Sequence, residues 1–105
     1  MVTAVRDLKK IDPRHSYAVN VNIIRDNLYA MTEYMDDFKN EHICIVGISQ
    51  NNYMKCISLL LNWRSWLQYK NSEQTDDLIP EITTVLAFYK AGLRHYKKCL
   101  EEAYA

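Results

Sequence analysis

Seven apolar residues in the first half of the chain recur at alternating steps of four and three positions. This heptad spacing is typical of a long helix that packs lengthwise against another helix. We expect the helix to begin at Asp12-Pro13, because Asp is a favoured N-cap and Pro suits the first helical position, and to run to about Asn40. The seam consists of Tyr17, Val21, Ile24, Leu28, Met31, Met35 and Phe38.

Two more segments with helical periodicity follow. The second helix is predicted over residues 50–70, with Ser49 as its N-cap. The third is predicted to begin at an N-cap formed by Asp76 or Asp77, and Pro80 is tolerated there because it lies in the first turn. The apolar face of the third helix consists of Leu78, Ile82, Val85, Tyr89, Leu93, Tyr96, Leu100 and Ala103.

The segment over residues 50–70 is apolar around more than half of its circumference at about 100° per residue. Its main apolar stripe is bordered by Leu59 and Trp66 on one flank and by Met54 and Leu61 on the other. A helix with so wide an apolar arc must contact two neighbours, or one neighbour and a partner chain. The main stripe consists of Tyr53, Cys56, Ile57, Leu60, Trp63 and Leu67.

Turn-forming residues are scarce, with two Gly and two Pro among 105 residues. A β-sandwich or barrel needs a turn signal about every 8–12 residues, so these fold classes are excluded. The length suits a single domain over residues 1–105, and short connectors place successive helices antiparallel. The predicted fold is all-α: an elongated antiparallel bundle of three long helices, preceded by a short N-terminal helix or arm over residues 1–12.

Charge and cysteine content narrow the function classes. The 13 Lys and Arg residues balance 13 Asp and Glu residues, so no overall field attracts nucleic acid. Three Cys residues without a disulfide-framework spacing predict reduced thiols and a cytoplasmic protein. The N-terminus does not resemble a signal peptide and no apolar stretch approaches the ~18 residues of a membrane span, so we expect no membrane contact. Nucleophile motifs and glycine-rich phosphate loops are missing, and we expect neither enzymatic activity nor a cofactor.

The connector between the first two helices is unusually apolar for a loop. Two interpretations stay open: it folds as a lid over the end of the core, or it is an exposed patch that docks to a second copy or to a target. Trp66, at the edge of the second helix, has two interpretations: an edge Trp is more often a residue at the rim of the core, but Trp66 with Leu59 is also the leading pair for binding a partner, because aromatic residues dominate binding energy at interfaces. The predicted protein-binding residues are Ile43, Ile45, Val46, Ile48, Leu59 and Trp66.

Nucleic-acid binding is the first alternative function. Lys and Arg side chains neutralise phosphates, and they gather in the N-terminal arm and on the outer face of the third helix. Glu101 and Glu102 follow the second group directly, and such a stripe is more often a solvated face, so this alternative is not favoured. The residues are Arg6, Lys9, Lys10 and Arg14 in the arm and Lys90, Arg94, Lys97 and Lys98 on the helix.

A zinc-stabilised bundle is the weaker alternative. The antiparallel order brings all three Cys residues and two of the three His residues to one end of the bundle, and thiolate and imidazole are zinc ligands. The chain has no CxxC pair, and free Cys residues are often inert and buried, so we expect no metal. The cluster consists of His42, Cys44, Cys56, His95 and Cys99.

These observations favour a non-enzymatic protein–protein interaction module. Its small size, balanced charge and lack of catalytic motifs suit a regulator, inhibitor, immunity-type protein or adaptor. It is expected to dock a helical face and the apolar connector onto a protein partner, by packing a helix into a groove. The wide apolar arc of the second helix further predicts a homodimer.

Overall fold

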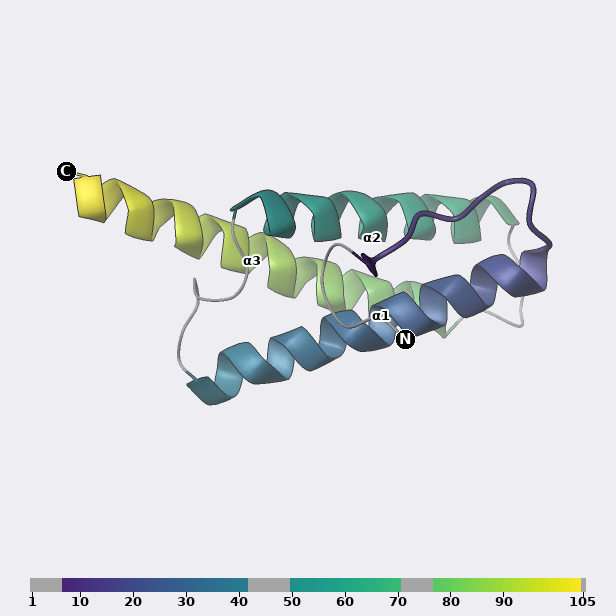
Figure 1. Cartoon of the computed structure of the whole chain (residues 1–105), viewed down its shortest axis with the longest axis horizontal. Coiled ribbons are helices and arrows are strands. Elements are labelled where there is room, and N and C mark those ends of the chain that lie inside the picture. Colours follow the sequence, from purple (N-terminus) through teal and green to yellow (C-terminus); the bar gives the residue numbers. More distant parts are fainter. Residues whose placement is uncertain (1–6, 42–49, 71–76, 105) are drawn as a thin grey trace.

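The computed structural model describes residues 7–41, 50–70 and 77–104 of the chain, and these ranges contain three helices and no strand. The helices are α1 (Tyr17–Glu41), α2 (Gln50–Lys70) and α3 (Leu78–Tyr104). Each helix runs in the opposite direction to the one before it, and the molecule measures 48 × 24 × 24 Å (Figure 1). The predicted helical class and elongated shape are therefore confirmed.

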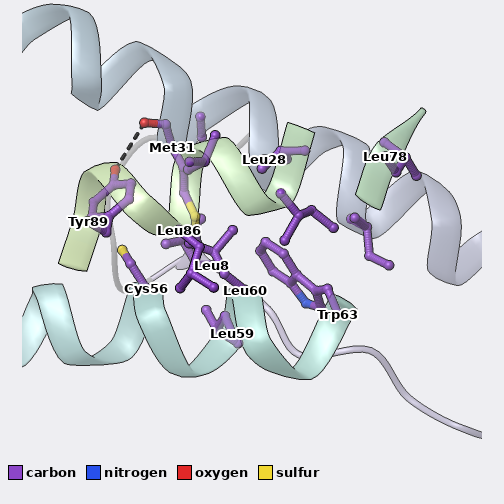
Figure 2. Packing of buried hydrophobic residues seen from close by; sticks show 14 of the residues in the cluster. Leu8, Leu28, Met31, Cys56, Leu59, Leu60, Trp63, Leu78, Leu86 and Tyr89 are labelled. Atoms are coloured by element: carbon purple, nitrogen blue, oxygen red, sulfur yellow. Dashed lines mark hydrogen bonds between the residues drawn. The ribbon is translucent and has the colours of Figure 1, made fainter. Parts of the chain in front are cut away.

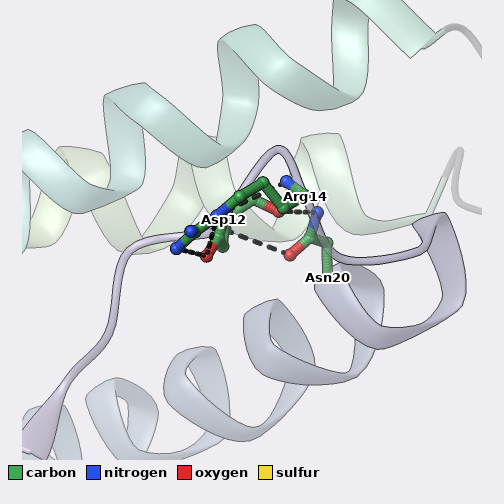
Figure 3. A network of polar contacts seen from close by, with 3 residues as sticks. All are labelled: Asp12, Arg14 and Asn20. Carbon is green, nitrogen blue, oxygen red and sulfur yellow. Dashed lines mark hydrogen bonds and ion pairs between the residues drawn. The ribbon is translucent and has the colours of Figure 1, made fainter.

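The predicted start of α1 is wrong by one turn. Asp12 and Pro13 belong to a turn before the helix, in which the His15 N–H donates to the Asp12 carbonyl oxygen at 3.0 Å. The Asp12 carboxylate accepts hydrogen bonds from the backbone N–H of Arg14, at 2.9 Å, and from its guanidinium (Figure 3). The helix is capped instead by Ser16, whose hydroxyl accepts from the Val19 N–H at 3.3 Å.

The heptad seam of α1 faces the core as predicted. Its central residues are buried, and Tyr17 and Met35 at its two ends are partly buried against the same cluster. The side chain of Phe38 lies outside the part of the chain that the structure describes. Asp26 and Glu33 are exposed on the opposite side. The buried seam residues are Val21, Ile24, Leu28 and Met31.

The core combines side chains from all three helices, with α2 and α3 sharing the closest contact between helices. Figure 2 shows Leu28 and Met31 of α1 facing side chains of α2 and α3 across the cluster. The predicted apolar face of α3 is buried from Leu78 to Tyr89 and partly buried at Leu93, Tyr96 and Leu100, whereas the side chain of Ala103 lies outside the described part. Fully buried large side chains include Trp63, Tyr53, Tyr89, Ile24, Leu60 and Ile82.

Gly92 marks the place where α3 passes closest to the side chain of Tyr53 on α2. A Cβ atom added at Gly92 would lie 2.7 Å from Cε1 of Tyr53. The Tyr53 ring is held between two rings of α3, with centroid distances of 6.2 Å to Tyr89 and 6.1 Å to Tyr96. The missing side chain of Gly92 therefore leaves the space that the Tyr53 ring fills.

Residues 7–12, which we call the strap, run antiparallel to α1 (Figure 1). Residues 8–12 of the strap are not helical, and residues 1–6 lie outside the described ranges. Leu8 of the strap is 5% exposed and belongs to the same cluster as the helical core residues. Within the described residues the N-terminal segment is thus an arm whose leucine completes the core.

Candidate protein-docking face on α2

The structure buries one flank of the wide apolar arc of α2. Leu59 is 2% exposed and lies in the core, so its predicted role as a contact to a partner is wrong. Trp66 is partly buried and stacks on Tyr17 of α1, with ring centroids 5.2 Å apart and an interplanar angle of 26°. The Leu59 and Trp66 flank is therefore used within the chain, because the core and α1 cover it.

The opposite flank of the arc remains in solvent. Met54 is 50% exposed and Leu61 is 37% exposed. They are seven positions apart and share one side of the helix, with Ser58 and Ser65 exposed on the same side. We call these four residues the outer face of α2. Large and small side chains alternate along it, which leaves room beside each apolar side chain for one from a partner.

The charged residues of α2 all have the same sign. Helix α2 contains Lys55, Arg64 and Lys70 and no acidic residue. The Lys70 ammonium lies 5.9 Å from the centroid of the Trp66 ring and 5.8 Å from that of Tyr69, and cations are attracted to the faces of such rings. A partner with carboxylates around an apolar centre would complement this helix electrostatically.

The apolar connector between α1 and α2 is not among the described residues. The predicted binding residues in it lie outside the described residues, so its lid and docking interpretations both stay predictions. The residues concerned are Ile43, Ile45, Val46 and Ile48.

The basic residues predicted for nucleic acid are arranged in two separate groups. On α3 the whole predicted stripe is exposed. In the arm, Lys9 and Lys10 are exposed, whereas Arg14 is paired with Asp12 at 2.9 Å. Arg6 lies outside the described residues. The exposed residues on α3 are Lys90, Arg94, Lys97 and Lys98.

The predicted Cys and His cluster does not form a ligand set within the described part of the chain. Cys56 is fully buried in the core, and its burial raises the pKa of the thiol to about 12. The thiol form therefore dominates at neutral pH, whereas zinc is bound by the thiolate. His95 is exposed on α3. His42, Cys44 and the side chain of Cys99 lie outside the described part, and the described residues contain no group of three potential metal ligands.

Two polar residues with structural importance were missed by the sequence analysis. Asn20 and Asn27 of α1 are buried at 1% and 3% exposure, and both bind the backbone of the strap. Their signal in the sequence is a pair of amide side chains seven positions apart, directly beside the apolar seam. Such a spacing places both amides on one face of a helix.

No helix in the described ranges has an apolar stretch long enough to cross a membrane. Comparisons with known protein families, with curated proteins and with solved structures found no match.

Proposed function

We propose that this chain is a non-enzymatic protein–protein interaction module that docks through the outer face of α2, and that a second copy of the chain is its first partner. The observation that carries the proposal is the exposure of Met54 and Leu61 on a helix whose other apolar residues, apart from the exposed Tyr69, are buried or packed against the core. Met is adaptable and is common at surfaces that bind helices. The docking role of the apolar connector stays a separate prediction from the sequence.

The outer face is complementary to itself. In an antiparallel pair of α2 helices, Met54 of one copy would pack beside Leu61 of the other, with the twofold axis near Ser58. The small side chains of Ser58 and Ser65 permit the close approach that this packing needs. A twofold pair uses the same patch on both copies, so one apolar stripe per chain is sufficient.

Light scattering behind a sizing column tests the proposal. The wild-type chain should elute at twice its mass of 12.4 kDa, and the double variant Met54→Ser/Leu61→Ser should elute as a monomer. The matched control is Val19→Ser/Tyr29→Ser, because these residues are 44% and 66% exposed and belong to α1 rather than to α2. The control should keep the mass of the wild type.

Salt separates self-docking from docking to an acidic partner. Self-association brings two helices with basic residues together, so added salt should preserve or strengthen the dimer by screening their repulsion. Docking to an acidic partner should instead weaken as salt is added, because salt screens the attraction between opposite charges. A wild-type monomer at all concentrations, or a dimer that both double variants retain, would show that the outer face is not the docking surface between copies.

The exposed basic stripe of α3 supports nucleic-acid binding as a second candidate function. Binding driven by phosphate contacts falls steeply with salt, with a slope of about −0.9 per contact for double-stranded DNA. Fluorescence anisotropy with mixed DNA and RNA oligonucleotides at low salt tests it, with Lys90→Gln/Arg94→Gln/Lys97→Gln as the comparison variant. Equal signals from the variant and the wild type would exclude the stripe as the binding surface.

A further inference from the structure

The strap is held on α1 through its backbone. The Lys9 N–H donates to Asn27 Oδ1 at 2.8 Å. The Asp12 N–H donates to Asn20 Oδ1 at 3.3 Å, while Asn20 Nδ2 donates to the Asp12 carbonyl oxygen at 2.9 Å (Figure 3). Because the two asparagines bind main-chain atoms, they would hold any extended segment that presents the same groups, whatever its side chains are.

The spacing of the two asparagines matches an extended chain. Asn20 and Asn27 are seven helical positions apart, which is a rise of about 10.5 Å at about 1.5 Å per residue. The three steps from Lys9 to Asp12 span about 10 Å in extended form at about 3.3 Å per residue. Two amide side chains that are seven positions apart on α1 can therefore contact two residues that are three positions apart in an antiparallel extended segment. Asn27 is held in place for this contact, because its Nδ2 donates to the Ile23 carbonyl oxygen at 2.6 Å.

One side chain adds an anchor to these backbone contacts. Leu8 is buried in the core, whereas Lys9 and Lys10 are exposed. Ile11 is partly buried against the same cluster. The strap thus occupies its position as a bound peptide would, with main-chain hydrogen bonds for affinity and a leucine in a pocket for specificity.

We propose that the surface formed by Asn20, Asn27 and the pocket of Leu8 is a binding site for an extended peptide segment of a partner protein, and that the strap is its resident intramolecular occupant. The incoming segment carries a leucine in the place of Leu8 and, directly after it, a backbone N–H for Asn27. The strap competes with it at a high effective concentration, because only residues 13–16 link it to α1. This site goes beyond the outer face of α2 and is independent of it.

A change of one backbone donor tests the site without removing a core side chain. Lys9→Pro deletes the N–H that Asn27 accepts, while the exposed Lys9 side chain makes no part of the pocket. Lys9→Ala is the matched control, because it removes the same side chain and keeps the N–H. The probe is a synthetic peptide of residues 7–14, titrated into isotope-labelled full-length chain and followed by NMR.

The peptide should bind the Lys9→Pro chain about five- to tenfold more tightly than the wild type or Lys9→Ala, because the weakened strap leaves the site open more often. A peptide that itself carries Lys9→Pro should bind less tightly, and one that carries Leu8→Ser should not bind. Equal affinities for the Lys9→Pro and Lys9→Ala chains, or no binding to either, would overturn the proposal.

If Lys9→Pro does not fold, a hydrogen-exchange measurement on the wild-type chain tests whether the peptide displaces the strap. Excess unlabelled peptide should speed hydrogen exchange at the Lys9 amide of the labelled chain several-fold, because the peptide displaces that amide from Asn27. The amide of Leu60 in α2 should exchange at an unchanged rate. A Lys9 amide that stays equally protected up to millimolar peptide would show that the strap is a permanent part of the fold.

Discussion

The Tyr89 hydroxyl donates a hydrogen bond to the backbone carbonyl oxygen of Met31 at 3.0 Å, which joins α3 to α1 inside the core. Tyr89→Phe removes this bond and keeps the ring, so we expect the free energy of unfolding to fall by about 0.5–1.5 kcal/mol. For a domain of this size each kcal/mol lowers Tm by about 4–8 °C. Thermal unfolding measures the change, and Tyr69→Phe is the control because Tyr69 is 83% exposed. Equal effects of the two substitutions would contradict the role of the Tyr89 hydroxyl.

Gly92→Ala should destabilise the protein although Ala is the better helix former. The gain in helix propensity is about 1 kcal/mol, and overpacking in a core costs about 1–3 kcal/mol. The new Cβ would lie 2.7 Å from a ring that neighbouring tyrosines hold in place, so the overpacking should prevail. Chemical denaturation measures the net effect. In a Tyr53→Leu background Gly92→Ala should become neutral or stabilising, and a loss of stability that persists there would locate the strain elsewhere.

Cys56 should make stability depend on pH in the alkaline range. Burial raises the pKa of its thiol from 9.0 to about 12, while the charge of Lys55 acts in the opposite direction. Above the ordinary pKa the unfolded chain loses this proton and the folded chain keeps it. The stability that the protonated Cys56 thiol contributes is therefore fully present below about pH 9. It is lost as the pH rises toward 12, at a slope of up to about 1.4 kcal/mol per pH unit.

The matching measurement compares the wild type with Cys56→Ala by chemical denaturation from about pH 8 to about pH 11. As the pH rises, the unfolding free energy of the wild type should fall relative to that of Cys56→Ala, because the thiol titrates and Ala does not. A difference that is independent of pH would mean that the thiolate is tolerated in the core. In a Cys44→Ser/Cys99→Ser background, the remaining thiol should react with a thiol reagent only after unfolding.

Asn20→Asp should disrupt the contact between the strap and α1. The carboxylate accepts hydrogen bonds but cannot donate one to the Asp12 carbonyl oxygen, and it would be an unpaired charge at a site that is 1% exposed. We expect a loss of more than about 2 kcal/mol at neutral pH. Burial raises the pKa of the new carboxyl, so the loss should shrink as the pH falls and the protonated group donates again. Denaturation at neutral and mildly acidic pH measures this, with Asn22→Asp on the exposed side of α1 as control.

The sequence was sufficient to predict the helices, because apolar periodicity over long segments reports directly on buried faces. The bounds of the second helix agree with residues 50–70, and the central residues of the α1 seam are buried as expected. The start of α1 was misplaced because Asp12 and Pro13 suit a turn as well as a helix cap. The hydrogen bonds that hold the Asp12 backbone in the turn come from Asn20, which is eight residues away.

The docking residues were less predictable than the helices. A periodicity argument finds the wide apolar arc of α2 but contains no information about which flank its neighbours cover. The stacking of Tyr17 on Trp66 and the burial of Leu59 settle that question through contacts distant in sequence. The strap was equally hidden, because its attachment depends on two asparagine side chains that bind backbone atoms.

Site-specific photo-cross-linking from position 54 tests the central claim, docking through the outer face of α2, most directly. With a photoreactive amino acid in place of Met54, irradiation should give a covalent dimer whose cross-link maps to α2 of the second copy near Leu61. The same amino acid in place of Tyr29, which is 66% exposed on α1, should give no dimer. Cross-links of equal yield from both positions, or none from position 54 at concentrations where light scattering detects a dimer, would contradict the account.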